Sequence, residues 1–345
     1  MNIPRGLKPI IIPALMDGLK PAPSKHEQTT ARIWVGRCVW SRPRSLVGMN
    51  GLLVLDKPAG MTSHDVVEIV RRATGERSVG HLGTLDPMAT GVLPLLLGKY
   101  TRLAQFFGTA EKAYEGTIRF GFATDSFDAE GTAAGEARPL LKSLDELRGL
   151  AARFHGEMEQ VPPVFSAKKI GGVPAHKLAR AGKPVEMKPA RIAIHRFELL
   201  SLEGATVEEM EARFEMQVSA GGYVRSVAHE LGTLAGCGAH LASLRRTQAG
   251  AFTLAQAIGL DNLKALAGEP GEIERRMPHP RTLLPEMPSV TVDEQAAGRL
   301  RNGMQVNLPE FSGAPLVKVF TGPAELLAIA KRIAGTLMQP IVVLA

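Results

Sequence analysis

The chain has 345 residues, of which 45% are hydrophobic and 22% charged. These proportions are those of an ordinary globular protein, and the length leaves room for more than one domain. No apolar run reaches the length of a membrane span, and the two cysteines, Cys38 and Cys237, have no metal-ligand spacing. A reducing compartment is the simpler interpretation, with Cys237 as a small buried residue.

The net charge of +7 is concentrated near the N-terminus. Residues 1–48 contain eight Lys or Arg and two Asp or Glu, a net +6, so residues 49–345 carry only +1. RNA binding by the main body would therefore depend on local basic clusters. Residues 1–48 lack both the amphipathic helix of a transit peptide and the apolar core of a secretory signal. We expect them to be a disordered, dispensable leader or the product of an upstream start choice.

The first elements of the body have clear boundaries. Leu52 to Leu55 predicts a buried strand that ends at Asp56. Thr62 and Ser63 are capping candidates for a helix that Gly75 would end. Further on, the pattern predicts helices over 100–108, 144–154 and 227–234, and strands over 114–122, 192–202, 214–219 and 240–254.

Two later regions differ in composition. Residues 160–190 are rich in proline, glycine and lysine and have little period, which predicts a long mobile insertion. From about Pro285, short apolar runs at 290–292, 306–308, 316–320 and 340–344 alternate with one helical stretch at 294–300. This pattern predicts a small strand-rich module.

A short loop, Gly80 to Pro87, connects the first helical region to the apolar run that starts at Gly91. Its two glycines allow a tight turn or a close approach to a ligand, and Pro87 biases Asp86 towards an extended backbone. The loop thus holds one carboxylate stiffly between two apolar elements. By itself, an aspartate in a loop is more often a turn former or a helix cap than a catalytic group.

Several blocks around this loop occur in a recognisable order: Gly51 to Ser63, Gly80 to Pro87, Lys112 to Tyr114, Val161 to Lys168, Gly222 to Ser226, Gly236 to Leu241 and Leu244 to Thr247. Together they resemble the TruB family of tRNA pseudouridine synthases over about residues 49–345. The resemblance implies an α+β fold with a mixed, mainly antiparallel sheet and flanking helices. It implies a catalytic domain at 49–284, with a thumb-loop insertion at about 160–190, and a PUA-like RNA-binding domain at 285–345.

The resemblance also implies the reaction. The enzyme would flip the T-loop uridine at tRNA position 55 out of the RNA, break its N1–C1′ bond and rejoin the base through C5. No atoms are lost and no redox change occurs, so the expectation is that neither a metal nor an organic cofactor is needed. The expected partner is the T-arm of tRNA, with no membrane and no protein partner, and the expected state is a cytoplasmic monomer.

Roles for individual residues follow from the same resemblance. Asp86 matches the catalytic carboxylate, Arg225 the cation that holds it ionised, and Tyr114 the aromatic residue that stacks on the target base and assists proton removal at C5. Without the resemblance, Arg225 would be a strand-end arginine in a surface ion pair, and Tyr114 a half-buried sheet residue. The substrate-binding residues that it implies are His81, Gly83, Thr84, Lys168 and Leu244.

Other charged residues have weaker assignments. The insertion is basic through Lys168, Lys169, Lys177, Arg180, Lys183 and Lys188, which suits a loop that grips phosphates. Arg245 and Arg246 are expected to extend that surface, with Arg102 and Lys99 as weaker candidates. Asp125 and Asp128 have no further ligand at metal spacing, which favours a structural loop. Asp56 is expected to end its strand and to order the following loop.

Rival functions remain open from sequence. A non-catalytic RNA chaperone would use the same surface. A carboxylate-nucleophile phosphatase needs a second acid two positions after the nucleophile and a magnesium site, whereas Pro87 and Met88 follow Asp86. A guide-RNA-dependent synthase subunit is less favoured, because the long insertion and the short C-terminal module suit a stand-alone enzyme. The chain departs from the family in its leader and in its apolar end, 340–344.

Overall fold

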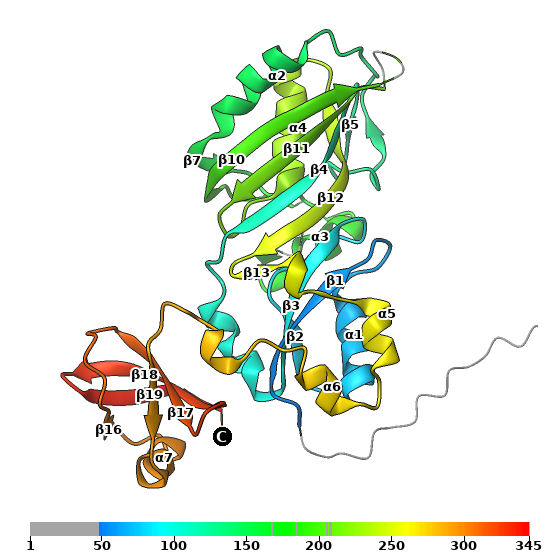
Figure 1. The fold of residues 1–345 in the computed structure, drawn as a ribbon. Coiled ribbons are helices and arrows are strands. Elements are labelled where there is room, and N and C mark those ends of the chain that lie inside the picture. The colour runs from blue at the N-terminus through cyan, green and yellow to red at the C-terminus, as the bar shows by residue number, and fades with distance from the viewer. Residues whose placement is uncertain (1–47, 167, 184, 205, 207–208, 345) are drawn as a thin grey trace, which may run out of the picture. The chain divides into compact units, whose positions relative to one another are not determined.

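A computed structural model describes residues 48–166, 168–183, 185–204, 206 and 209–344, with the side chains of residues 176 and 180 left aside. The expectation of a disordered leader concerns residues outside these ranges, apart from Gly48. Within the described ranges, most of the chain forms one large sheet with helices, and a smaller sheet lies near the C-terminus (Figure 1). No helix in this part of the chain is both long enough and apolar enough to cross a membrane.

The large sheet is mixed and mainly antiparallel. Its main path runs β14-β1-β3-β12-β4-β11-β10-β7, with β2 paired to β3 and β13 paired to β12. Only the β1–β14 and β3–β12 pairings are parallel among these described strands. The strands are β1 (Gly51–Lys57), β2 (Val79–His81), β3 (Thr90–Leu97), β4 (Lys112–Phe120), β7 (Gly156–Gln160), β10 (Ala190–Glu203), β11 (Glu211–Val218), β12 (Ala239–Ala249), β13 (Phe252–Thr253) and β14 (Ile258–Gly259).

The first helix, α1 (Ser63–Thr74), begins and ends where the sequence predicts. The Thr62 side chain accepts from the Asp65 backbone N–H, and the Asp65 carboxylate accepts from the Thr62 N–H, so both ends of a capping box are present. Gly75 has φ +73°, in the left-handed region that suits glycine, and its N–H closes the last turn on the Arg71 carbonyl. The start of α1 is therefore fixed, and with it the position of Ser63.

Helices cover the sheet and its edge. Helix α2 (Leu144–Ala151) packs against β10, and α4 (Val224–Ala235) packs against β12. Together with α1 and the sheet they enclose one continuous core that contains Leu53, Ile118 and Leu231, all fully buried. The segment predicted as a helix over 100–108 is instead a 3₁₀ helix, η1 (Gly98–Phe106). Smaller elements are β5 (Ala123–Thr124), β6 (Ala133–Ala134), η2 (Ala152–Phe154), η3 (Leu254–Gln256), α5 (Leu260–Ala265), α6 (Pro270–Glu274) and η4 (Pro280–Thr282).

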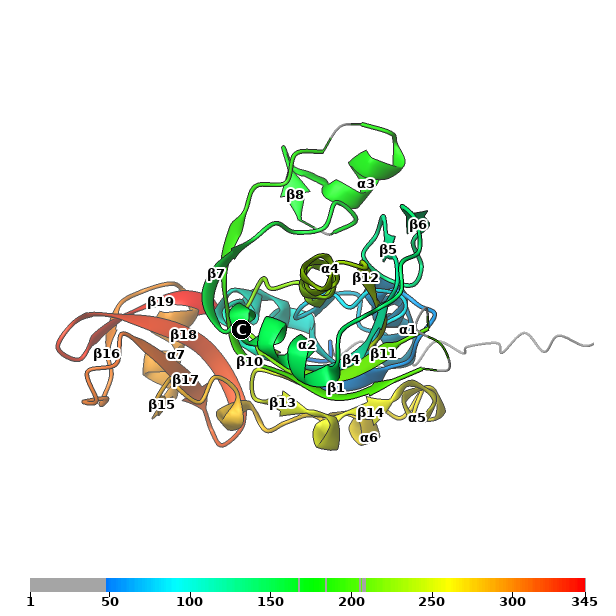
Figure 2. The ribbon, with the colours of Figure 1, turned by 90° about the horizontal axis from the view of Figure 1, so that it is seen from above.

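The insertion at 160–190 has more structure than its composition suggests. It contains a two-stranded hairpin, β8 (Lys169–Ile170) and β9 (Val173–Pro174), followed by helix α3 (Ala175–Arg180). Figure 2 shows β8 and α3 standing out from the sheet on the side that carries α4. The sequence analysis predicted an insertion with little period and named no helix or strand within it. The hairpin and helix are too short to produce a recognisable hydrophobic period.

The C-terminal module is a five-stranded sheet in the order β15-β17-β18-β19-β16 with one helix. Its elements are β15 (Ser289–Val292), α7 (Glu294–Arg301), β16 (Val306–Asn307), β17 (Leu316–Thr321), β18 (Glu325–Ala334) and β19 (Leu337–Val343). Strand β18 was not among the predicted strands, although its run Leu326 to Ala330 is apolar and buried. Buried Lys318 ties the module to the preceding segment by donating to the carbonyls of Arg281 and Leu283, at 2.8 and 2.6 Å.

Candidate active site

The loop between β2 and β3 carries Asp86 and is anchored to the start of α1. The Ser63 hydroxyl donates to the Leu85 carbonyl (3.0 Å) and accepts from the Leu85 N–H (2.8 Å). The Gly60 N–H donates to the Pro87 carbonyl (2.9 Å). Leu85 is buried between these contacts. The residues on both sides of Asp86 are therefore fixed to the same structural element, which leaves the carboxylate itself little freedom.

Buried Lys57 is a second anchor for this loop. Its Nζ donates to the carbonyls of Pro58, Pro87 and Ala89, at 2.9, 3.2 and 2.6 Å. Burial lowers the pKa of Lys57 to about 8, with Asp86 acting in the opposite direction. Asp56, which the sequence analysis expected to order the loop after its own strand, binds Arg245 in a bidentate ion pair.

Arg225 holds Asp86 by two contacts. Its Nε lies 3.0 Å from Asp86 Oδ2, and its Nη2 donates to Oδ1 at 3.2 Å. The predicted short helix begins earlier than expected: α4 starts at Val224, so Arg225 lies in its first turn and not at a strand end. The Arg225 side chain is buried, whereas that of Asp86 is 33% exposed. The planar guanidinium therefore presents the carboxylate in one orientation.

The same guanidinium binds a second carboxylate, Asp128. Arg225 Nη1 lies 3.3 Å from Asp128 Oδ2, and both side chains are 5% exposed. Sequence reasoning missed this contact because it tested Asp125 and Asp128 only as a metal pair. The two aspartates diverge, since Asp125 accepts from the Thr132 N–H at 2.9 Å. Their Asp-x-x-Asp spacing was the available signal, but only the tertiary structure brings Asp128 to Arg225.

The electrostatics of Asp86 reflect all of these neighbours. Burial raises the pKa of Asp86, Arg225 opposes the rise, and Asp128 adds to it. The sequence analysis considered only Arg225 and so overlooked the effects of burial and of Asp128 on this pKa. Because Asp128 competes for the same guanidinium, the ion pair holds Asp86 less strongly in its ionised form than an undivided arginine would.

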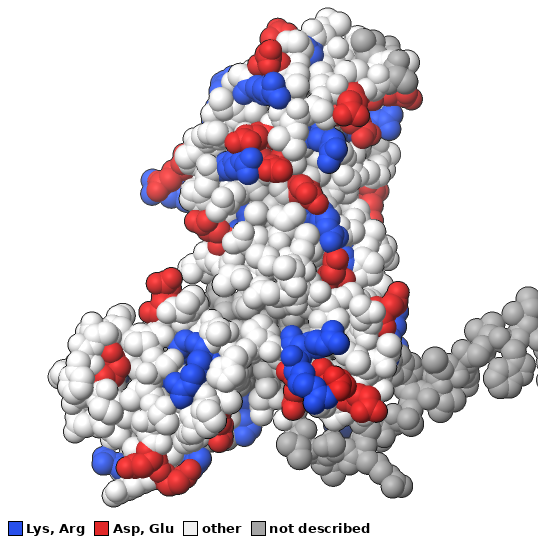
Figure 3. Space-filling view, viewed as in Figure 1, with Lys and Arg blue, Asp and Glu red and all other residues white. Residues whose placement is uncertain are grey.

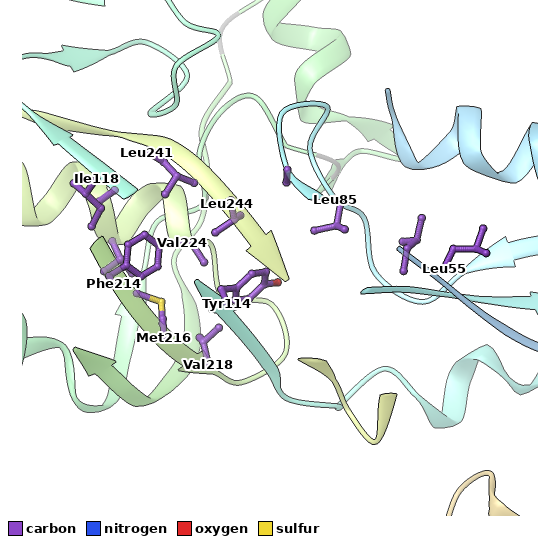
Figure 4. Packing of buried hydrophobic residues seen from close by; sticks show 14 of the residues in the cluster. Leu55, Leu85, Tyr114, Ile118, Phe214, Met216, Val218, Val224, Leu241 and Leu244 are labelled. Carbon is purple, nitrogen blue, oxygen red and sulfur yellow. The ribbon is translucent and has the colours of Figure 1, made fainter. Parts of the chain in front are cut away.

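Asp86 and Arg225 open onto a pocket of about 510 Å³. Tyr114 on β4 and Leu244 on β12, each 8% exposed, lie on neighbouring strands and face the loop that carries Leu85 (Figure 4). A pocket of this size with apolar walls and a few convergent polar groups is typical of a small-molecule or nucleotide site. Seven of the eight predicted site residues line it: Gly83, Thr84, Asp86, Tyr114, Lys168, Arg225 and Leu244.

The eighth, His81, lies at an adjoining hollow that also reaches Thr84 and Asp86. Its Nδ1 is buried without a partner among the described residues. Burial, followed by the charge of Arg246, lowers the pKa of His81. Both influences disfavour the protonated imidazole, which suits a contact with a base more than one with a phosphate.

Arg246 was misplaced by the sequence analysis. The expected surface cation is fully buried, and it donates to the carbonyls of Val92 (2.7 Å) and Gly83 (3.0 Å). Arg102, expected near the active loop, instead donates to the Val343 carbonyl of the C-terminal module. Both arginines bind backbone carbonyls of sequence-distant segments, a pairing that no local pattern can indicate.

Exposed lysines cluster on the insertion. Lys169, Lys177, Lys183 and Lys188 are all exposed there, and Lys168 donates to the Lys188 carbonyl at 3.0 Å. The sheet face turned away from α4 differs: acidic and basic side chains alternate over β10, β11 and β4 (Figure 3). Arg196 there contacts Glu198 and Glu215, at 2.7 and 2.9 Å. The field that would attract phosphates is therefore on the side of the insertion.

Comparison with known proteins places this arrangement in a family. The model described as TruB family pseudouridylate synthase (N terminal domain) matches residues 71–224, and that described as tRNA pseudouridylate synthase B C-terminal domain matches 225–279. A protein of Solibacter usitatus named tRNA pseudouridine synthase B is 44% identical over 299 residues, which are 86% of this chain and 100% of that protein. The chain belongs to the TruB family. The predicted family is thus confirmed.

Other similar proteins agree. A tRNA pseudouridine synthase B of Symbiobacterium thermophilum is 44% identical over 256 residues, 74% of this chain and 83% of that protein. Among solved structures, a Cbf5-Nop10-Gar1 complex matches with a TM-score of 0.62 and 26% identity, over 86% of this chain and 85% of that one. An H/ACA RNP bound to a substrate RNA containing 2′-deoxyuridine matches with a TM-score of 0.61 and 25% identity, over the same shares. The predicted α+β fold is confirmed by these neighbours.

Proposed function

We propose that this TruB-family chain isomerises uridine to pseudouridine in tRNA, and that its target is the T-loop uridine at position 55. The observation that carries the proposal is the Asp86–Arg225 pair at the mouth of a pocket walled by Tyr114 and Leu244. It places one oriented carboxylate where an extruded nucleotide can reach it. The tRNA substrate follows from the names of its relatives.

In this proposal Asp86, Tyr114 and Leu244 each have a role in the rearrangement. Asp86 is the nucleophile that adds to C6 or C1′ while the N1–C1′ bond breaks. The detached uracil turns within the pocket, held between Tyr114 and Leu244, and C5 bonds to C1′. The bond between Asp86 and C6 or C1′ breaks, which regenerates the free carboxylate. The proton on C5 leaves, with the Tyr114 hydroxyl assisting, and N1 gains a proton. Atoms and electrons balance without an oxidant or reductant.

Binding would depend on extrusion of the target base and on charge. A carboxylate that opens into a pocket cannot reach a base inside a stacked arm, so the nucleotide must flip into the pocket. The folded T-arm would be recognised by shape, with the lysines of the insertion neutralising phosphates. His81, in the adjoining hollow, would fill the space which the base leaves.

The domain division belongs to the same proposal. We assign catalysis to residues 49–284, with 160–190 as a thumb that closes on RNA, and RNA contact to a PUA-like domain at 285–345. We further propose a cytoplasmic monomer that acts on tRNA without a protein partner.

The test is tritium release from T-arm RNA labelled as [5-³H]uridine, with chelator present. Wild type should release tritium, whereas Asp86→Asn should release none while keeping its affinity for RNA. Asp145→Asn, on the exposed surface of α2, is the matched control and should behave like wild type. Replacing the uridine at position 55 with cytidine should abolish release.

Three results would each contradict part of the proposal. If neither wild type nor Asp86→Asn released tritium, and both bound RNA tightly, the chain would be an RNA chaperone. If Asp86→Asn matched wild type in release, the carboxylate would not be the nucleophile. Retained release from the cytidine-55 RNA would show that a different uridine is the target.

A further inference from the structure

The end of the pocket next to Gly83 contains an arginine nitrogen without a partner. Arg246 is fully buried, and its Nε and Nη2 donate to carbonyls, but Nη1 has no acceptor within the described residues. Arg246 nevertheless lines the pocket that holds Asp86. A buried N–H of a charged group that has lost water without gaining an acceptor is costly. A ligand acceptor would remove that cost.

A second cation lies beside it. Lys112 lines the same pocket, and its Nζ makes one hydrogen bond, to the Ala110 carbonyl at 2.7 Å. A Cβ built on Gly83 would lie 3.4 Å from both Arg246 Nη1 and Lys112 Cε. The two cationic side chains therefore lie together on one side of Gly83, which has φ +100°. The Lys112 side chain, held by a single bond, is the part free to rearrange around a ligand.

Neither Lys112 nor Arg246 takes part in an ion pair among the described residues, so no acidic side chain there compensates their charges. Burial, and after it the charge of Arg246, lowers the pKa of Lys112. Two adjacent cations without a carboxylate favour a ligand with a formal negative charge over a neutral carbonyl.

The position of Lys112 and Arg246 relative to the expected base site narrows the range of candidate ligands further. Lys112 precedes Tyr114 by two residues on β4, so both side chains lie on one face of the strand. Arg246 is the direct cross-strand partner of Tyr114. An anion bound by Lys112 and Arg246 would therefore be separated from a base held against Tyr114 by about the length of one nucleotide. The backbone phosphate that flanks the extruded nucleotide meets this requirement.

We propose that Arg246 Nη1 and Lys112 Nζ form an oxyanion subsite for an RNA backbone phosphate next to the target uridine. This subsite rests on the proposed function, because it assumes that the extruded nucleotide enters the pocket. Gly83 is required as a glycine here, since a side chain would stand between the phosphate and both cations.

The first test compares binding of T-arm RNA by Lys112→Met, Lys112→Arg and wild type. Loss of one charged phosphate contact should weaken binding about tenfold and reduce the slope of log K against log salt by about 0.7. Lys112→Arg should restore both. Arg153→Met removes an exposed cation on η2 and should change neither. Lys112 is tested in place of Arg246, because Arg246 also holds Gly83 and Val92.

The second test identifies the anion. RNAs with a single neutral methylphosphonate linkage are compared at each position flanking the target. A methylphosphonate at one particular position should weaken binding to wild type but cause no further loss of binding to Lys112→Met. This is expected because the methylphosphonate and the substitution would remove the same contact. Additive losses at every linkage would overturn the subsite. Competition by inorganic phosphate with no dependence on linkage would show that the site takes free phosphate and not RNA.

Failure of this inference is distinguishable from failure of the proposed function. Tritium release by wild type from the unmodified RNA reports the function alone. Release by wild type together with an unchanged salt slope for Lys112→Met would overturn the subsite and leave the enzyme. Absence of release by wild type would remove the basis for both.

Discussion

Arg225 divides its guanidinium between two carboxylates of different exposure. Asp86 lines the pocket and is 33% exposed, whereas Asp128 is 5% exposed and does not line it. The Arg225 side chain also donates to the carbonyls of Ser126 (3.2 Å) and Phe165 (2.9 Å). With four acceptors the guanidinium has one possible orientation, so in the proposed reaction Asp128 would act by positioning Arg225.

An Asp128→Asn substitution should change both the rate and its pH dependence. The negative charge of Asp128 helps to raise the pKa of Asp86, so its removal should lower that pKa. Since Asp86 acts as a carboxylate, the acidic limb of the pH–rate profile should move to lower pH. The maximal rate should fall by about tenfold or more, because Arg225 loses a charged acceptor.

The measurement is the tritium-release rate over a range of pH, together with the affinity for RNA, which should stay near that of wild type. Asp125→Asn is the matched control: it makes the same change in the same loop, where the carboxylate only accepts from Thr132. A rate loss without a movement of the acidic limb would mean that Asp128 is merely structural.

At the scale of elements, the catalytic loop depends on the first turn of α1. The capping box of Thr62 and Asp65 fixes where this helix starts, and Ser63 then binds both backbone groups of Leu85. A strand, a helix start and a loop from different parts of the sequence thus meet next to Asp86. Lys57 adds the end of β1 to this arrangement.

A Ser63→Ala substitution should therefore affect activity as well as stability. It leaves the Leu85 N–H and carbonyl without partners in a buried place, which should lower the free energy of unfolding by about 1–3 kcal/mol. It should also lower the tritium-release rate, because the residue before Asp86 loses its anchor. Unfolding by urea and the release assay measure the two effects.

The control is Thr74→Ala, at the other end of the same helix. Its hydroxyl donates to the Val70 carbonyl, so stability should fall slightly while turnover is preserved. Equal losses of turnover in the two variants would show that α1 acts on the site only through overall stability.

At the scale of the whole molecule, charge is separated between faces. The chain beyond residue 48 is almost neutral, yet the insertion concentrates exposed lysines, while the sheet face turned away from α4 pairs its charges (Figure 3). A near-neutral protein can bind RNA strongly when its basic groups are clustered in this way.

Replacing Lys169, Lys177 and Lys183 with methionine should weaken RNA binding without changing turnover at saturating RNA. The slope of log K against log salt should decrease by about 2 for three lost phosphate contacts. The control neutralises three exposed cations elsewhere, Arg153, Lys264 and Arg275, and so makes the same change in net charge. Equal salt slopes for the two triple variants would show that net charge, and not the thumb, governs binding.

Local sequence determined the elements with strong local signals. The capping residues and Gly75 bounded α1, the continuous apolar run of 52–55 gave β1, and Gly80 to Pro87 marked the loop that carries Asp86. These features are decided within a few residues by dihedral preferences and capping, so they can be seen without a fold. The family resemblance supplied the partners of Asp86 by position.

The tertiary structure alone decided which distant charged groups meet. Asp128 joins Arg225 from 97 residues away, Lys57 holds Pro87, and Arg246 is buried against Gly83 and Val92. Nothing in the immediate sequence of these residues distinguishes them from surface charges. Their roles arise from burial, where a charged group must find a partner in whichever segment the sheet brings beside it.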